Sequence, residues 1–95
     1  MEQEAQEAAA RIAEMFNSLA EIYILHLAAC ETQEEFNKTQ EKSFVSMRET
    51  FVKRFKVSKI KAANMVRIVL AIVRSKCGDK SIDDSYIKGA LANAF

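Results

Sequence analysis

The chain holds one histidine, and its spacing from a cysteine is the first feature that could support chemistry. His26 and Cys30 stand four positions apart, so on a helix both side chains could reach one metal ion. A structural zinc site uses four protein ligands and a catalytic site uses three, and no third ligand is evident beside this pair. We therefore expect no metal and no cofactor, and we interpret His26 as a residue packed between helices.

The remaining nucleophiles and acids do not form a catalytic pattern either. Cys30 has no glycine-rich turn near it, and Cys77 follows a predicted helix end, where backbone carbonyls disfavour a thiolate. The acid pairs at 34–35 and 83–84 are adjacent in sequence, so their side chains point in different directions on a helix. Helix-start electrostatics explain them better than acid–base catalysis. No phosphate-binding, dinucleotide-binding or calcium-loop motif is present, and we predict a non-enzymatic protein.

Charge is distributed unevenly, although the net charge of the whole chain is only +1. Residues 1–35 hold eight acids and one base, which gives −7, whereas residues 38–76 hold eleven bases and two acids, which gives +9. A concentration of positive charge is typical of a nucleic-acid surface. The opposite charges could also neutralise each other, within one copy or between copies, and both interpretations stay open.

Composition indicates an all-α fold in a single domain spanning residues 1–95. Hydrophobic residues make up 49% of the chain, which has two glycines and no proline, so the residues that supply most sharp turns in sheets are scarce. The acidic start does not resemble a signal peptide, and the longest apolar run, 68–73, is far shorter than the ~20 residues of a membrane span. We expect a cytoplasmic protein with no membrane contact and with both cysteines reduced.

Hydrophobic spacing and capping residues predict a compact domain of four helices, at about residues 4–30, 33–55, 59–76 and 82–94. Thr32 followed three residues later by Glu35 is a capping box that begins the second helix. Ser58 can cap the third helix, and Gly78 can end it in a left-handed conformation. Ser81 should lead into the last helix, whose apolar face would dock through Phe95.

The third helix is apolar around most of its circumference, and the first carries a heptad stripe that runs from Ala5 to Ala29. An apolar arc this wide belongs in the centre of a bundle or at a subunit interface. We therefore predict a homodimer, whose copies share part of their core. Its interface would be formed by the first helix through Ile12, Phe16, Leu19 and Tyr23.

The basic segment 48–67 resembles a helix-turn-helix. Val52 and Phe55 match buried positions of the first helix, 56–58 the turn, and Ala62 and Met65 buried positions of the second. The resemblance implies that Asn64 reads adenine and that the basic side chains bind phosphates or face the major groove. The sequence departs from the pattern at Lys56, where glycine is usual, and at Ile60, which would be exposed. The predicted nucleic-acid-binding residues are Lys53, Arg54, Lys56, Lys59, Lys61, Asn64 and Arg67.

A second segment, GDKSIDDSYIKGAL at residues 78–91, resembles the final loop and third helix of histone-fold proteins, although Tyr86 stands where that family usually has an aspartate. This resemblance implies a central helix about two turns longer than residues 59–76. One uninterrupted helix from about Phe51 would supply that length but would remove the helix-turn-helix. The continuity of the backbone at residues 57–58 therefore decides between the two resemblances.

Together these features predict a small regulatory protein that binds DNA or another nucleic acid through residues 48–67. The alternative is a helical protein–protein interaction module, such as an inhibitor, an adaptor or an immunity-type factor, with no role on nucleic acid. The basic segment favours the first interpretation, and the possibility that acidic residues of the first helix neutralise it favours the second.

Overall fold

The structure is a computed structural model that describes residues 2–94. Within these residues four helices follow one another with no strand: α1 (Glu2–Ala28), α2 (Gln33–Phe55), α3 (Lys59–Lys76) and α4 (Asp84–Ala94). The predicted all-α fold of four helices is confirmed. Phe95, which we expected to be docked, lies outside the described residues.

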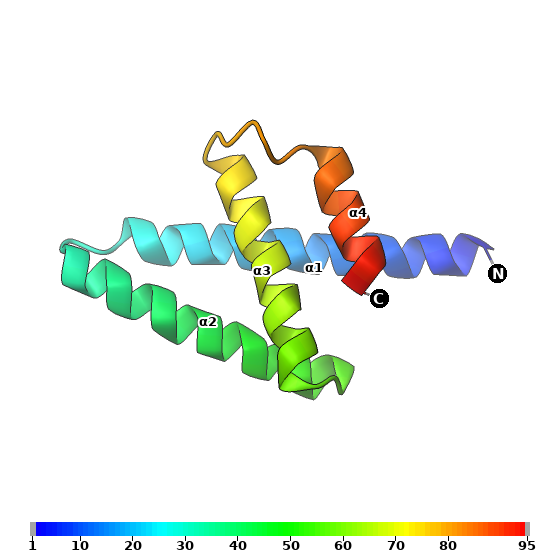
Figure 1. Ribbon diagram of the computed structural model, residues 1–95, viewed down its shortest axis with the longest axis horizontal. Coiled ribbons are helices and arrows are strands. Elements are labelled where there is room, and N and C mark those ends of the chain that lie inside the picture. The colour runs from blue at the N-terminus through cyan, green and yellow to red at the C-terminus, as the bar shows by residue number, and fades with distance from the viewer. Residues whose placement is uncertain (1, 95) are drawn as a thin grey trace.

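Helix α3 is the centre of the domain. It contacts each of the other three helices, crossing α2 and α1, while α4 returns alongside it in the opposite direction (Figure 1). Seven of its side chains are buried, as the wide apolar arc predicted. They are buried within a single copy of the chain, so α3 occupies the centre of the bundle. The buried residues of α3 are Ala62, Met65, Val66, Ile68, Val69, Ile72 and Val73.

Aromatic rings of α1 and α2 complete the core against α3. The ring of Phe51 lies 5.1 Å from that of Phe16 in a tilted arrangement and 5.9 Å from that of Phe55. Such pairs add to the free energy that burial of their apolar area contributes. Phe16 and Phe51 are fully buried, so they fix how α1 and α2 sit relative to each other.

Local hydrogen bonds set the helix boundaries where the sequence placed them. The Glu35 N–H donates to Thr32 Oγ1 (3.1 Å), and the Glu35 carboxylate accepts from the Glu31 N–H (3.0 Å), which closes the predicted capping box. At the end of α3, Gly78 has φ = +101°. Its N–H donates to the Ser75 carbonyl, which satisfies one of the carbonyls that the helix end leaves open.

The loop before α4 differs in detail from the prediction. The Asp79 carboxylate accepts hydrogen bonds from the backbone and hydroxyl of Ser81 and from Arg74, so Ser81 belongs to this loop and does not cap a helix. Asp83 takes that role, because its Oδ1 accepts from the Tyr86 N–H (2.8 Å). Helix α4 therefore begins at Asp84, two residues later than expected.

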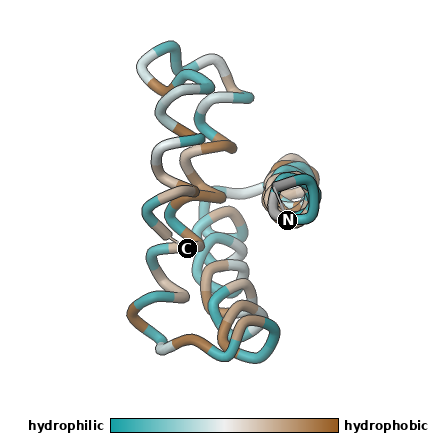
Figure 2. Tube along the Cα trace, turned by 90° about the vertical axis from the view of Figure 1, so that its right-hand side faces the viewer, coloured by the Kyte–Doolittle hydropathy of each residue, from teal (hydrophilic) through white to brown (hydrophobic). Residues whose placement is uncertain are grey.

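Helix α1 has one covered side and one open side. The other three helices all lie to one side of it, as the view along α1 in Figure 2 shows. Phe16 and Tyr23 point into the core of the same chain, with Ile12 and Leu19 partly buried beside them. Of the four predicted interface residues, Phe16 and Tyr23 therefore have little surface to offer a second copy in this conformation. The open side instead carries Ile22 (49% exposed) and Leu25 (68% exposed).

None of the four helices has an apolar stretch long enough to cross a bilayer, within the residues described.

Candidate nucleic-acid interface

Helices α2 and α3 meet in a short turn at the place where the two resemblances differ. Helix α2 ends at Phe55, three residues follow, and α3 begins at Lys59. The helix is therefore interrupted at residues 57–58, with the spacing of a helix-turn-helix. The histone-fold resemblance lacks the long central helix that it requires. We call residues 48–67 the basic corner.

The turn has a conformation that its sequence does not favour. Lys56 adopts φ = 53° and ψ = 45°, the left-handed region in which glycine is usual. For a residue with a side chain this conformation costs roughly 1–2 kcal/mol. Ser58 then caps α3, because its Oγ accepts a hydrogen bond from the Lys61 N–H (3.2 Å). Half-buried Val57 packs against the core and holds the turn in place.

The side chains of the basic corner divide between core and solvent as the resemblance implies. Phe51, Ala62 and Met65 are buried, and Val52 and Phe55 are partly buried against the core. Ala63, beside Asn64, is half-buried. All seven predicted nucleic-acid-binding side chains are exposed: Lys53, Arg54, Lys56, Lys59, Lys61, Asn64 and Arg67.

The exposed cations of the basic corner are not neutralised by the chain's own acids. The described residues contain four ion pairs: Arg11–Glu7, Lys38–Glu34, Arg74–Asp79 and Lys76–Glu21. None of them includes a lysine or arginine of residues 48–67. Only the Lys76–Glu21 contact, at 3.6 Å, joins the basic part of the chain to the acidic α1. The positive charge of the corner is thus open to solvent.

Asn64 and Arg67 form a unit that sequence reasoning treated as two separate residues. The Arg67 Nη1 donates a hydrogen bond of 2.6 Å to Asn64 Oδ1. Reading adenine takes both the oxygen and the nitrogen of an asparagine amide, and here the oxygen is already engaged. Arg67 keeps further N–H donors for a phosphate or a guanine. The i, i+3 spacing of the two residues on one helix was the signal for this contact.

Ile60 lies among these cations and is 78% exposed, which agrees with the departure noted in the sequence. An apolar side chain at this position could contact a thymine methyl group in the major groove. It could equally enter an apolar depression on another protein. The exposure of Ile60 is therefore compatible with both functions considered above.

The residues considered for catalysis and metal binding lie elsewhere. His26 is exposed, so the expectation that it packs between helices is wrong: it lies at the surface, on the edge of a groove between α1 and α2. The Cys30 Sγ lies 3.3 Å from Thr39 Oγ1 and 3.4 Å from the His26 carbonyl. In the described part of the chain, no three histidine, cysteine or acidic side chains are grouped as metal ligands.

Among the described residues, two titratable groups are shifted by their surroundings, and neither belongs to the basic corner. Burial raises the pKa of Tyr23, and a hydrogen bond with Gln40 opposes part of that rise. Hydrogen bonds from the hydroxyl and backbone of Ser81, together with Arg74, lower the pKa of the Asp79 carboxyl. These shifts follow from packing and loop structure, and they provide no acid–base pair for catalysis.

Comparison of the chain with protein-family models, with curated proteins and with solved structures gives no match in any of the three.

Proposed function

We propose that this chain is a non-enzymatic regulatory protein that binds nucleic acid through the basic corner. One observation carries the proposal. Six cations and an asparagine are exposed on two helices joined by a three-residue turn, and none of those cations pairs with a carboxylate in the described part of the chain. Unpaired cations gathered on one surface attract phosphates and gain entropy when condensed counterions are released.

In this proposal the two helices have different roles. Lys53, Arg54 and Lys56, at the end of α2, contact phosphates on one side of a groove. The first two turns of α3 enter the major groove, where the Asn64–Arg67 unit meets base edges. Contacts to phosphates set the position of the protein, and contacts to bases supply sequence preference.

Salt dependence provides the direct test. If four to six phosphates are contacted, log K for a duplex should fall against log salt with a slope of about −4 to −5. Lys53→Ala should weaken binding to every sequence alike. Lys80→Ala removes an exposed lysine outside the basic corner and is the matched control, which should leave affinity unchanged. Absence of binding at about 50 mM salt, where such contacts are strong, would contradict the proposal.

A second candidate is a protein-binding module, and the open side of α1 favours it. Ile22 and Leu25 are large, exposed and close to each other on this helix. Beside them, α1 and α2 form a groove of about 280 Å³ that includes Leu19 and Met47. If this is the function, a partner captured without nucleic acid should be lost when Leu25 is replaced by serine and retained in Lys53→Ala.

A further inference from the structure

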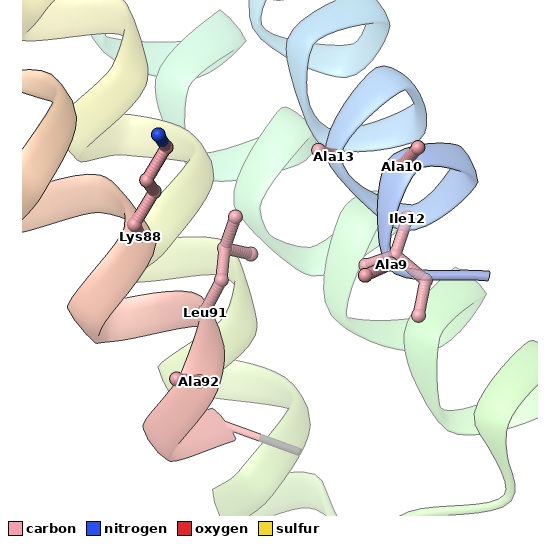
Figure 3. Close-up of a pocket in the computed structure, with 7 residues that line it drawn as sticks. All are labelled: Ala9, Ala10, Ile12, Ala13, Lys88, Leu91 and Ala92. Atoms are coloured by element: carbon pink, nitrogen blue, oxygen red, sulfur yellow. The ribbon is translucent and has the colours of Figure 1, made fainter. Parts of the chain in front are cut away.

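An apolar groove separates the first half of α1 from α4. Helix α4 packs chiefly on α3, and the N-terminal part of α1 extends past it (Figure 1). The space between them has a volume of about 430 Å³. Figure 3 shows Leu91 projecting from α4 toward α1, opposite small alanine side chains. The residues that line the groove are Ala9, Ala10, Ile12, Ala13, Lys88, Leu91 and Ala92.

The α1 rim of this groove is acidic. Glu7 precedes Ala10 by three positions and Glu14 follows it by four, so both carboxylates border the Ala10 side of the groove. Glu7 lies 3.8 Å from Arg11, and Glu14 forms no ion pair with a described residue. Among the described residues that line the groove, Lys88 is the one cation, and it stands on the opposite wall. An apolar group carrying positive charge would therefore fit best against the α1 side.

The basic corner presents such a group. Ile60 is more exposed than the other large hydrophobic side chains at the surface of the described part of the chain, which are Ile22, Leu25, Val45 and Tyr86. Its neighbours along the chain are lysines at positions 56, 59 and 61, all exposed. An exposed apolar side chain with lysines near it in sequence complements, in polarity and in charge, an apolar groove with an acidic rim.

We propose that two copies of this chain dock reciprocally, with Ile60 and the surrounding lysines of each copy seated in the α1–α4 groove of the other. Charge complementarity favours a second copy as the occupant, because among the described residues the charges of −7 and +9 meet within one copy only at Lys38–Glu34 and Lys76–Glu21. In Figure 1 the turn between α2 and α3 lies in the same half of the molecule as α4 and the N-terminal part of α1, whose residues line the groove. A two-fold axis can therefore form both contacts at once and close the pair.

The regulatory consequence rests on the proposed function. The surface that binds a second copy is the one that would bind nucleic acid, so the two ligands compete for it. The dimer then keeps the basic corner covered until a polyanion displaces the acidic rim. Self-docking itself does not require that nucleic acid binds.

Sedimentation or light scattering of the purified chain, free of nucleic acid, tests the docking. We expect a dimer at low salt whose dissociation constant rises with salt, because the charges around the groove are screened. Ile60→Ser should weaken the dimer by about tenfold or more, since one apolar contact is lost at each of two sites. Leu25→Ser, at another exposed apolar position, is the matched control and should leave the dimer intact. A monomer at every salt concentration overturns the proposal, and so does a dimer that Leu25→Ser dissociates while Ile60→Ser does not.

A charge exchange makes the test specific to this pair of surfaces. Lys59→Glu and Glu14→Lys should each weaken self-association, and an equimolar mixture of the two variants should restore it as a heterodimer. In that heterodimer the altered corner of one copy meets the altered rim of the other, and the second contact is unaltered. Both positions are exposed, and an acid in the first turn of α3 suits the helix dipole, so both variants should fold. Failure of the mixture to restore the dimer contradicts the assignment.

Addition of a short duplex separates this proposal from the proposed function. If the dimer dissociates into monomers that are bound to the duplex, the result supports both self-docking and nucleic-acid binding. If the chain forms a dimer that Ile60→Ser weakens but never binds the duplex, self-docking is supported and the proposed nucleic-acid binding is contradicted. A duplex bound with its affinity unchanged by dimer formation overturns the assignment of the basic corner to self-docking.

Discussion

Replacing Lys56 by glycine should stabilise the fold and weaken nucleic-acid binding at the same time. Lys56 has φ = 53°, and an L-residue in that region carries a cost of roughly 1–2 kcal/mol. Glycine avoids this cost but loses about 0.5–1 kcal/mol more conformational entropy on folding. The net gain in the free energy of unfolding therefore lies between about 0 and 1.5 kcal/mol, and its middle value of about 0.75 kcal/mol corresponds to a rise in Tm of about 3–6 °C for a domain of this size.

The same substitution removes one exposed cation from the basic corner. If Lys56 contacts a phosphate, the slope of log K against log salt should become less negative by about 0.9. Thermal unfolding followed by circular dichroism gives the stability term, and a salt titration with a duplex gives the binding term. Tm should rise, because the substitution relieves strain in the backbone, whereas the affinity for the duplex should fall, because it removes the charge of the side chain.

Lys53→Gly is the matched control. It removes one exposed cation too, but from inside α2, where glycine destabilises a helix by about 0.5–1 kcal/mol. Binding should therefore change alike in the two variants, while Tm rises in one and falls in the other. If Lys56→Gly lowers Tm as Lys53→Gly does, Lys56 is not left-handed in solution and the geometry assigned to the turn is wrong.

Three further outcomes are expected. Met65→Ala should cost about 2–5 kcal/mol of unfolding free energy, because Met65 is fully buried, whereas Ile60→Ala at an exposed position should stay within about 0.5 kcal/mol; denaturant unfolding compares them. Asn64→Ala should alter sequence preference, because it breaks the Asn64–Arg67 unit, and should leave the salt slope unchanged. A panel of duplexes measures this change, which differs from the uniform loss expected for Lys53→Ala. Asp79→Asn should lower Tm at neutral pH, because the folded-state pKa of the Asp79 carboxyl is lowered. The stability that this carboxylate contributes is fully present above its ordinary pKa of 3.8 and is lost as pH falls through the folded-state value. Plots of Tm against pH for the two proteins should therefore converge in acid.

The helix boundaries that rest on local chemistry were predictable. Thr32 and Ser58 cap α2 and α3 through hydrogen bonds to residues three positions ahead, and Gly78 ends α3. Each of these contacts joins residues within one helical turn, so the sequence alone predicts where it forms. The start of α4 was predicted two residues too early, because serine and aspartate are both good caps. The hydrogen bonds of Asp79 with Ser81 hold Ser81 in the loop, and Asp83 caps the helix instead.

The candidate site could be predicted in part. Exposure of Lys53 and its neighbours follows from their places between the apolar positions of α2 and α3. The link between Arg67 and Asn64 was not foreseen, although their spacing permits it. The acidic rim of the α1–α4 groove was beyond sequence reasoning, because it depends on where α4 comes to lie along α1.

The sequence left open whether residues 33–76 form one helix or two, and the structure places a turn between α2 and α3. By itself the sequence determined that the chain is all-helical, where α2 begins and α3 ends, and that α3 is apolar around most of its circumference. These properties follow from residue spacing and capping groups only a few positions apart. The tertiary structure alone decided how α1 is rotated about its axis. Packing of Phe16 against Phe51 turns Phe16 and Tyr23 inward and leaves Ile22 and Leu25 outside. The apolar stripe of α1 is wider than the area that the other helices cover. The sequence of α1 does not specify which part of the stripe is covered, because that depends on helices distant in sequence.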